Sequence, residues 1–386
     1  MDLLFLTPVG VQKGQLVSSL RTQLKSKDEV QTFRIVSDAL VPLVHLRVFD
    51  LDVDLQFAAV PSAHIHAPLK APAKVLDSLD SVSRRSLGAL LDYDLLLQRV
   101  PEPSQAKFRS VLTAVRAWAK LRDISSNGFC TLGGISWSGT TSSPLLRVNF
   151  LLSCVANGLL SLVLVSAFFS QMKAESMSSE ELVGAFFEYY STWNWTQSVG
   201  LDASTSRPAS STGSGVIQIS APSDHKMNTA RNSTLSSTRI LQAEFTRAAN
   251  LVRESKASGT RPWVALLESC VPAKLPHHSF LTLDFSASTQ EELDICSGWL
   301  SGHLVTLVLG LESKLLNARP FSTPLPGAGN LVSCRYVIVL NKEPRPEGSA
   351  PISFGEDILA FDNLFHSWSE KPQTAALKLT QFKELI

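Results

Sequence analysis

The stretch FRSVLTAVRAWAKLRDISSNGFCTLGGISW, residues 108–137, joins a helical pattern to a polar turn and a Gly-Gly corner. Side chains three or four residues apart share one face of a helix, so this spacing predicts one basic stripe and one apolar stripe. The basic stripe consists of Arg109, Thr113, Arg116 and Lys120, and the apolar stripe of Val111, Val115, Trp118 and Ala119. Ser104 is the candidate N-cap. An ordinary solvated helix face would carry the same cations, so the helix alone leaves a role in anion binding open.

The composition sets limits on the fold and on the partners. A chain of 386 residues with 44% hydrophobic residues suits two or three domains with ordinary cores. The formal net charge of +1 excludes a globally basic nucleic-acid-binding protein, so any contact with a polyanion must be local. The five cysteines contain no CxxC pair, which argues against a zinc cluster or a disulfide framework and fits a reducing compartment. No signal peptide is expected, because no cationic segment precedes an apolar run at the N-terminus.

The N-terminal part predicts strands around a group of acidic residues. Residues 1–6 read as a strand, residues 16–27 as a helix, and residues 28–40 either continue that helix or break from it. Residues 43–59 alternate as a strand pair in which Asp50, Asp52 and Asp54 recur at period two and share one face. Carboxylates arranged in this way suit a divalent cation such as Mg²⁺, or they form the wet face of an edge strand.

The middle of the chain predicts helices with two irregular segments. Helices are expected over residues 76–100, 180–195 and 232–250, the last with Ser237 or Thr238 as N-cap. The apolar run 145–169 admits three interpretations: an insert, a buried helix or a membrane span. Residues 202–215 are rich in Ser, Thr and Gly and predict a disordered loop, and residues 255–262 mark a boundary.

The C-terminal part predicts an α+β sandwich of the ferredoxin-like kind. Strands are expected at 280–285 and 332–340 and helices at 293–315 and 358–365, with a capping box at 288–291. Acidic residues outnumber basic ones from Arg261 onward, and no aromatic pair of the kind used by RNA-binding sheets stands out. The sequence of this part therefore offers no basic footprint for RNA.

The motifs AVRAWAK at 114–120, ISSN at 124–127 and LGGISW at 132–137 resemble the eukaryotic poly(A) polymerase family of the DNA polymerase beta nucleotidyltransferase superfamily. The resemblance continues at 33–58 and 232–245, and it covers about two thirds of the chain. It implies an α+β multidomain protein with a partial nucleotidyltransferase palm, a helical central domain and a ferredoxin-like C-terminal domain. The implied ranges are 1–72 for the remainder of the catalytic domain, 73–254 for the central domain, with an atypical apolar insert at about 139–170, and 262–386 for an RNA-binding-type sandwich.

The same resemblance implies the site residues. Asp2 and Asp54 take catalytic, metal-binding positions, and the nucleotide-binding positions fall on Arg116, Lys120, Ser125, Asn127, Gly133, Gly134 and Ile135. Four departures are visible. Arg116 stands where the family has the first of two helix lysines that contact the triphosphate. The family's first Asp and its Gly-Ser turn are absent before Asp2, which indicates either a truncated gene model or the loss of half the metal site. Gly88 stands where the family has an Asn that contacts the nucleotide, and Ser125 stands where it has a Tyr that stacks on the base.

By resemblance, the expected function is the template-independent transfer of AMP from ATP to the 3′-hydroxyl of mRNA, with Mg²⁺ or Mn²⁺, in the nucleus. The expected partners are an RNA 3′ end and cleavage and polyadenylation factors, the expected state is a monomer, and no membrane association is expected. Activity is expected to be impaired in the chain as printed. The alternative is a non-catalytic relative that binds RNA or a processing complex.

Overall fold

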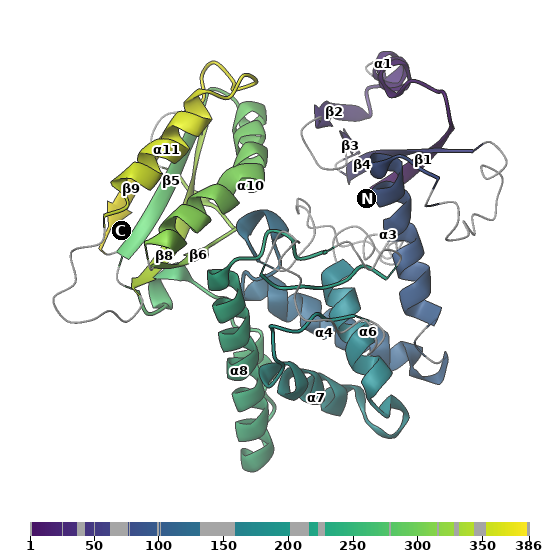
Figure 1. The fold of residues 1–386 in the computed structure, drawn as a ribbon, viewed down its shortest axis with the longest axis vertical. Coiled ribbons are helices and arrows are strands. Elements are labelled where there is room, and N and C mark those ends of the chain that lie inside the picture. The colour runs from purple at the N-terminus through teal and green to yellow at the C-terminus, as the bar shows by residue number, and fades with distance from the viewer. Residues whose placement is uncertain are drawn as a thin grey trace.

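The computed structural model of the chain contains helices and sheets in three units (Figure 1). The described residues are 2–24, 26–36, 43–49, 51–61, 76, 78–98, 100, 102–131, 159–200, 216–222, 228–277, 279–314, 316–327, 332–342 and 353–383. In Figure 1 the N-terminal sheet and the C-terminal unit stand to either side above a helical unit. This mixed architecture confirms the predicted α+β multidomain class.

The N-terminal unit is a mixed four-stranded sheet in the order β1-β4-β3-β2. Its strands are β1 (Asp2–Pro8), β2 (Val30–Val36), β3 (Leu43–Val48) and β4 (Leu51–Val60). β1 runs parallel to β4, and the other pairs are antiparallel. Helix α1 (Lys13–Leu24) packs on the face that carries Val53 and Leu55. Because alternate residues face opposite sides of a strand, Asp54 lies on the other face.

Two expectations for this unit are settled by the strands. Helix α1 ends at Leu24 and β2 begins at Val30, so the helical continuation of residues 28–40 is wrong over 30–36. β4 begins at Leu51, so Asp50 precedes the strand and lies outside the described residues, whereas Asp52 and Asp54 are both in β4. The strand pair itself is confirmed.

The helical unit gathers its long helices around aromatic side chains. Its helices are α3 (Ser81–Gln98), α4 (Gln105–Leu121), α6 (Leu159–Gln171), α7 (Ser179–Ser191) and α8 (Leu235–Ser258). Trp118 of α4 packs with its ring centroid 4.9 Å from that of Phe187 and 5.2 Å from that of Phe245. Tyr190 donates a hydrogen bond of 2.8 Å to the carbonyl oxygen of Leu164 in α6. One core therefore joins α4, α6, α7 and α8.

α6 settles part of the question about the apolar run 145–169. Its residues from Val163 to Phe168 are buried in the core of the helical unit, which supports the interpretation as a buried helix for this half of the run. Residues 145–158 lie outside the described residues, as do residues 202–215.

α8 has an earlier N-cap than predicted and extends beyond the end of the predicted range 232–250. Its N-cap is Thr234, and neither Ser237 nor Thr238 takes that role. Ser237 instead occupies the third helical position and accepts a hydrogen bond from the backbone N–H of Thr234, which completes a capping box. The helix continues to Ser258 through the start of the predicted boundary and ends at Gly259, whose φ of 68° suits glycine.

The C-terminal unit has the ferredoxin-like order β6-β8-β5-β9, with the short β7 beside β8. Its elements are β5 (Ser279–Ala287), α10 (Gln290–Ser313), β6 (Leu316–Pro320), β7 (Leu325–Pro326), β8 (Val332–Lys342), α11 (Gly355–His366) and β9 (Ala376–Phe382). The capping residue of α10 is Thr289, which accepts from the N–H of Glu292, one position later than the predicted box. By length and composition alone α10 could cross a membrane, but its buried residues line the core of this unit.

Candidate functional site

Helix α4 has the two faces that its sequence predicts. Val111, Val115 and Trp118 are buried, whereas Arg109 and Lys120 are exposed and Arg116 is half-buried. Arg116 and Lys120 lie one turn apart on the same side of the helix. Ser104 is the N-cap residue, as predicted. Its backbone angles are helical, however, and its side chain accepts no capping hydrogen bond from the backbone of the described helix. A short 3-10 turn, Glu102–Ser104, leads into α4 instead.

The polar turn after α4 is stabilised by hydrogen bonds between its own residues. The N–H of Thr131 donates to the carbonyl oxygen of Ser126 at 3.1 Å, and the Thr131 hydroxyl donates to the same oxygen at 2.9 Å. Asp123 and Cys130 have φ values of 53° and 60°, so the chain turns sharply at both ends of the loop. Ser125 is half-buried in this loop, and Asn127 starts its 3-10 turn. We name residues 124–131 the polar loop.

The polar loop is anchored in the C-terminal unit. Phe129 is 5% exposed and belongs to the core of that unit, with its ring centroid 5.4 Å from that of Tyr336. A Cβ on Gly128 would lie 2.8 Å from the Cβ of Ser301 in α10, so the loop backbone touches that helix. Ser237 donates a hydrogen bond to the carbonyl oxygen of Cys130. Two units therefore hold the segment that carries Ser125 and Asn127.

A buried ion cluster connects the end of α4 to α8 and to β6 of the C-terminal unit. Glu244 of α8 accepts from Arg122 Nε at 2.9 Å, from Arg247 Nε at 3.1 Å and from Arg319 Nη2 at 3.0 Å. Burial alone would raise the pKa of the Glu244 carboxyl, but the hydrogen bond from Arg122 and the charges of the three arginines outweigh it and lower the pKa. Next to this cluster, the backbone N–H of Ser322 donates to Asp123 at 2.9 Å. We name Glu244 and its three arginines the Glu244 cluster.

The sheet brings together the two aspartates that the resemblance singles out. Asp2 of β1 is the direct partner of Asp54 in the parallel pairing with β4. On the other side of β4, His45 of β3 is the direct partner of Asp54 in the antiparallel pairing. Directly opposed residues in neighbouring strands share a face of the sheet. Asp2, Asp54 and His45 therefore occupy one row across three strands.

His45 and Asp54 are in direct contact. Nδ1 of His45 lies 2.8 Å from Oδ1 of Asp54, and the two side chains are 22% and 26% exposed. An ionised carboxylate only accepts, so the imidazole N–H donates. The sequence analysis missed His45, and only the strand pairing, with Leu43–Val48 beside Leu51–Val60, could have pointed to it.

The strand that carries Asp54 is tied to the helical unit at its far end. The backbone N–H of Ala59 donates to Ser83 Oγ of α3 at 2.8 Å. Asp80 caps α3 by accepting from the N–H groups of Val82 and Ser83 at 3.0 and 2.9 Å. Partial burial would raise the pKa of Asp80, but the hydrogen bond from the Ser83 hydroxyl, together with the two backbone hydrogen bonds, outweighs it and lowers the pKa. The Asp54 strand thus has a fixed connection to the helix that follows it.

The donor set suits a hard divalent cation bound with substrate. Among the described residues, no group of three His, Cys, Asp or Glu side chains could hold a metal ion by itself. Mg²⁺, however, is usually held by one or two carboxylates and completes its shell with water and substrate phosphates. Asp54, partly exposed and paired in register with Asp2, fits that mode.

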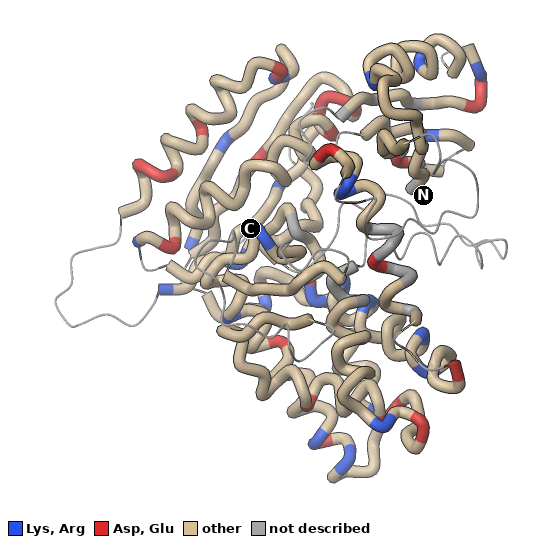
Figure 2. Tube along the Cα trace, turned by 45° about the vertical axis from the view of Figure 1, so that its right-hand side comes forward, with Lys and Arg blue, Asp and Glu red and all other residues tan. Residues whose placement is uncertain are grey.

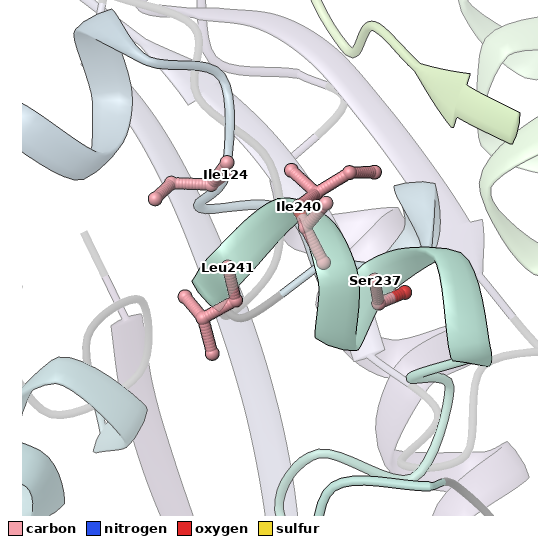
Figure 3. A pocket seen from close by; sticks show the side chains of 5 residues that line it. Ile124, Ser237, Ile240 and Leu241 are labelled. Carbon is pink, nitrogen blue, oxygen red and sulfur yellow. The ribbon is translucent and has the colours of Figure 1, made fainter. Parts of the chain in front are cut away.

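A pocket beside the polar loop has different chemistry. Figure 3 shows it between the loop and α8. Its lining consists of Ile124, Thr131, Ser237, Ile240 and Leu241. Small-molecule sites usually contain convergent polar groups, whereas the walls of this pocket are mostly apolar, as in a packing gap behind the loop. Neither Arg116, Lys120 nor Ser125 lines it.

For several other predicted site residues, the structure describes only the backbone or nothing. Gly133, Gly134 and Ile135 lie outside the described residues, and of Asp2 and Asn127 only the backbone is described. Arg116 and Lys120 lie on α4, an element separate from the Asp2–Asp54 row. Gly88 is a buried position in α3. In Figure 2, basic and acidic residues are interspersed over the described part of the molecule, in agreement with the net charge of +1.

Comparison with curated proteins identifies relatives along most of the chain. Nuclear poly(A) polymerase 1 of Arabidopsis thaliana is 26% identical over 355 residues, which are 88% of this chain and 46% of the relative. The poly(A) polymerase of Dictyostelium discoideum is 24% identical over 408 aligned residues, covering 100% of this chain and 47% of the relative. The chain thus spans about half the length of these relatives. No family model matches it.

Solved structures that are similar to this chain have lower sequence identity to it. The structure of Cid1 in complex with its short product ApU covers 70% of this chain and 80% of its own, with 14% identity and a TM-score of 0.45. The crystal structure of mtPAP in complex with UTP covers 66% of this chain and 53% of its own, with 12% identity and a TM-score of 0.41. The sequence comparison agrees with the motifs around α4: over most of its length, the chain is similar in sequence to eukaryotic poly(A) polymerases.

Proposed function

We propose that the chain contributes to the extension of RNA 3′ ends by template-independent transfer of AMP from ATP. The single observation that carries this proposal is the register of β1 and β4, which places Asp2 opposite Asp54 in a chain related to poly(A) polymerases. A divalent cation bound there would lower the pKa of the RNA 3′-hydroxyl and neutralise charge on the transferring phosphoryl group.

The chain's own residues have separate tasks in this proposal. Asp2 and Asp54 bind Mg²⁺ or Mn²⁺, and Arg116 and Lys120 bind the triphosphate from the exposed side of α4. Arg116 presents a planar fork rather than the point charge of a lysine, which preserves the positive charge and changes the geometry of the contact. The polar loop, with Ser125 and Asn127, and residues 133–135 form the nucleotide side of the site.

In this proposal, the chain binds the nucleotide base less tightly than the family pattern implies. Ser125 offers no ring for stacking, and a base–aromatic stack contributes roughly 1–3 kcal/mol. Gly88 has no side chain to contact the nucleotide. We therefore propose weak ATP binding, with nuclear location and contacts to cleavage and polyadenylation factors as further parts of the same hypothesis. No membrane association is part of it, and a monomer is the state proposed.

Primer extension tests the proposal. Purified chain is incubated with an oligo(A) primer, Mn²⁺ and each of the four nucleoside triphosphates in turn, beside Asp54→Asn. We expect slow extension that prefers ATP, because the sequence as printed has one aspartate in β1, and no extension by Asp54→Asn. Equal extension by both proteins would contradict the placement of the metal.

The second candidate is a non-catalytic relative that binds RNA or a processing complex. The changes at Gly88 and Ser125 favour it, because both remove side chains that the family uses on the nucleotide. In that case oligo(A) would bind without extension, and Asp54→Asn would bind it as tightly as the unchanged chain. Filter binding and primer extension, measured on both proteins, together separate the two candidates.

A further inference from the structure

The partner of Asp54 on β3 is a feature that the family resemblance does not assign. The antiparallel pairing sets His45 directly opposite Asp54, and the imidazole Nδ1 lies 2.8 Å from the carboxylate Oδ1. Both side chains are mostly buried, with 22% and 26% of their surfaces exposed. A contact of this length, formed between two ordered strands, limits the rotation of the Asp54 side chain.

The contact distinguishes the two oxygens of the carboxylate. The N–H of His45 donates to Oδ1, so that oxygen has a fixed protein partner. Because the two oxygens belong to one rigid carboxylate group, this hydrogen bond also restrains the direction of Oδ2. The backbone supports this arrangement, because Leu46 and Val53, the next pair in register, are both buried on the α1 side. The packed side of the hairpin thus holds the strands at the spacing that the contact needs.

We propose that His45 is a positioning residue that orients the Asp54 carboxylate for a divalent cation. This inference rests on the proposed function, since it takes Asp54 as a metal ligand. Outer partners of metal-binding carboxylates fix ligand geometry, and their loss typically weakens metal binding about 10–100-fold. The alternative is a pair that only stabilises the sheet, as many cross-strand pairs do.

Metal titration of the whole chain separates these roles. The probe is Mn²⁺ alone, followed by isothermal titration calorimetry and by the electron paramagnetic resonance signal of free Mn²⁺, without ATP or RNA. Two variants remove the donor, His45→Val and His45→Phe, the second of which keeps a ring. His45→Asn keeps an amide donor close to the position of Nδ1. Gln56→Val, a polar-to-apolar change two residues from Asp54 on the same face of β4, is the matched control.

We expect the Kd for Mn²⁺ to rise about 10–100-fold in both donor-free variants. His45→Asn and Gln56→Val should stay close to the unchanged chain. Circular dichroism shows whether each donor-free variant folds. If one of them does not, Mn²⁺ binding by the other still tests the inference. Unchanged Mn²⁺ binding in a folded donor-free variant would overturn the inference, and so would an equal loss in His45→Asn.

Asp54→Asn distinguishes failure of this inference from failure of the proposed function. If Asp54→Asn loses Mn²⁺ binding while the donor-free variants keep it, the metal site stands and the role of His45 is refuted. If Asp54→Asn binds Mn²⁺ as tightly as the unchanged chain, the proposed metal site is wrong and the inference is refuted with it. If the unchanged chain binds no Mn²⁺ in the absence of substrate, the inference is refuted, and the primer-extension assay with Asp54→Asn decides on the metal site.

Discussion

Arg116 and Lys120 are single side chains whose role is testable without disturbing the fold. Both lie on the side of α4 away from buried Val115 and Trp118. Replacing either with Ala should raise KM for ATP and lower kcat/KM, because a phosphate contact strengthens as charge develops on the transferring group. Steady-state primer extension at varied ATP measures this. The free energy of unfolding should change by no more than about 0.5 kcal/mol, and unchanged ATP kinetics would mean that the stripe is only a solvated face.

Trp118 on the opposite side of the same helix should behave in the reverse way. Its ring contacts Phe187 and Phe245 and is 2% exposed. Trp118→Ala should lower the free energy of unfolding by about 3–5 kcal/mol, because the core cannot close over so large a deletion. Urea denaturation followed by circular dichroism checks the value. A loss below about 1 kcal/mol would contradict the burial described for this helix face.

At the scale of elements, the polar loop depends on the close approach of Gly128 to α10. A Cβ at position 128 would lie 2.8 Å from the Ser301 Cβ and 2.9 Å from its carbonyl oxygen. Gly128→Ala should therefore cost about 1–3 kcal/mol and weaken ATP binding, since the loop must move. Gly302→Ala is the control, because its Cβ would have no atom within 4 Å. That change should leave ATP binding intact and stabilise α10 slightly. Equal ATP affinity in both variants would separate the loop from the nucleotide site.

Most helices were predictable because their side chains repeat with the helical period. All four residues of the apolar stripe predicted for α4 are buried, and α4 buries Phe108 and Leu112 as well. β2 was missed in part because Val30–Val36 follows a helix without a Gly or Pro to mark the change. The N-cap of α8 was misplaced because Thr234 and Ser237 are both good caps, and only the hydrogen bonds distinguish them.

The candidate site was predictable only in its separate parts. Asp54 followed from the alternation of one strand together with the family resemblance, but its pairing with Asp2 depends on β1 lying beside β4, far away in sequence. The role of His45 could not be predicted either, because its contact with Asp54 depends on the register of β3 and β4. The anchoring of Phe129 in the C-terminal core also depends on tertiary packing, because an isolated Phe in a polar turn has no period to reveal its partner.

At the scale of the whole molecule, the Glu244 cluster joins α4, α8 and β6. Removing one partner of a buried ion group leaves the others uncompensated, so Glu244→Gln should lower the free energy of unfolding by about 3–5 kcal/mol at pH 7. Because the folded-state pKa of Glu244 is lowered, its contribution is fully present above the ordinary value near 4.5 and is lost as the pH falls below it. The stability difference between the two proteins should therefore shrink on acidification.

Thermal unfolding of both proteins between neutral and acidic pH measures this difference. Lys256→Gln is the control, since its ion pair with Glu188 is exposed and should contribute little at any pH. A Glu244→Gln variant that loses stability equally at all pH values would show that shape, rather than the ionised carboxylate, accounts for the effect.

The position of Phe129 also orders events while the chain is being made. This ring leaves the ribosome long before β8, which carries its partner Tyr336. Domains form as they emerge, at roughly 5–20 residues per second, so the helical unit can pack while the polar loop still lacks its anchor. The loop therefore gains this anchor only after β8 has been synthesised, because the contact between Phe129 and Tyr336 cannot form earlier.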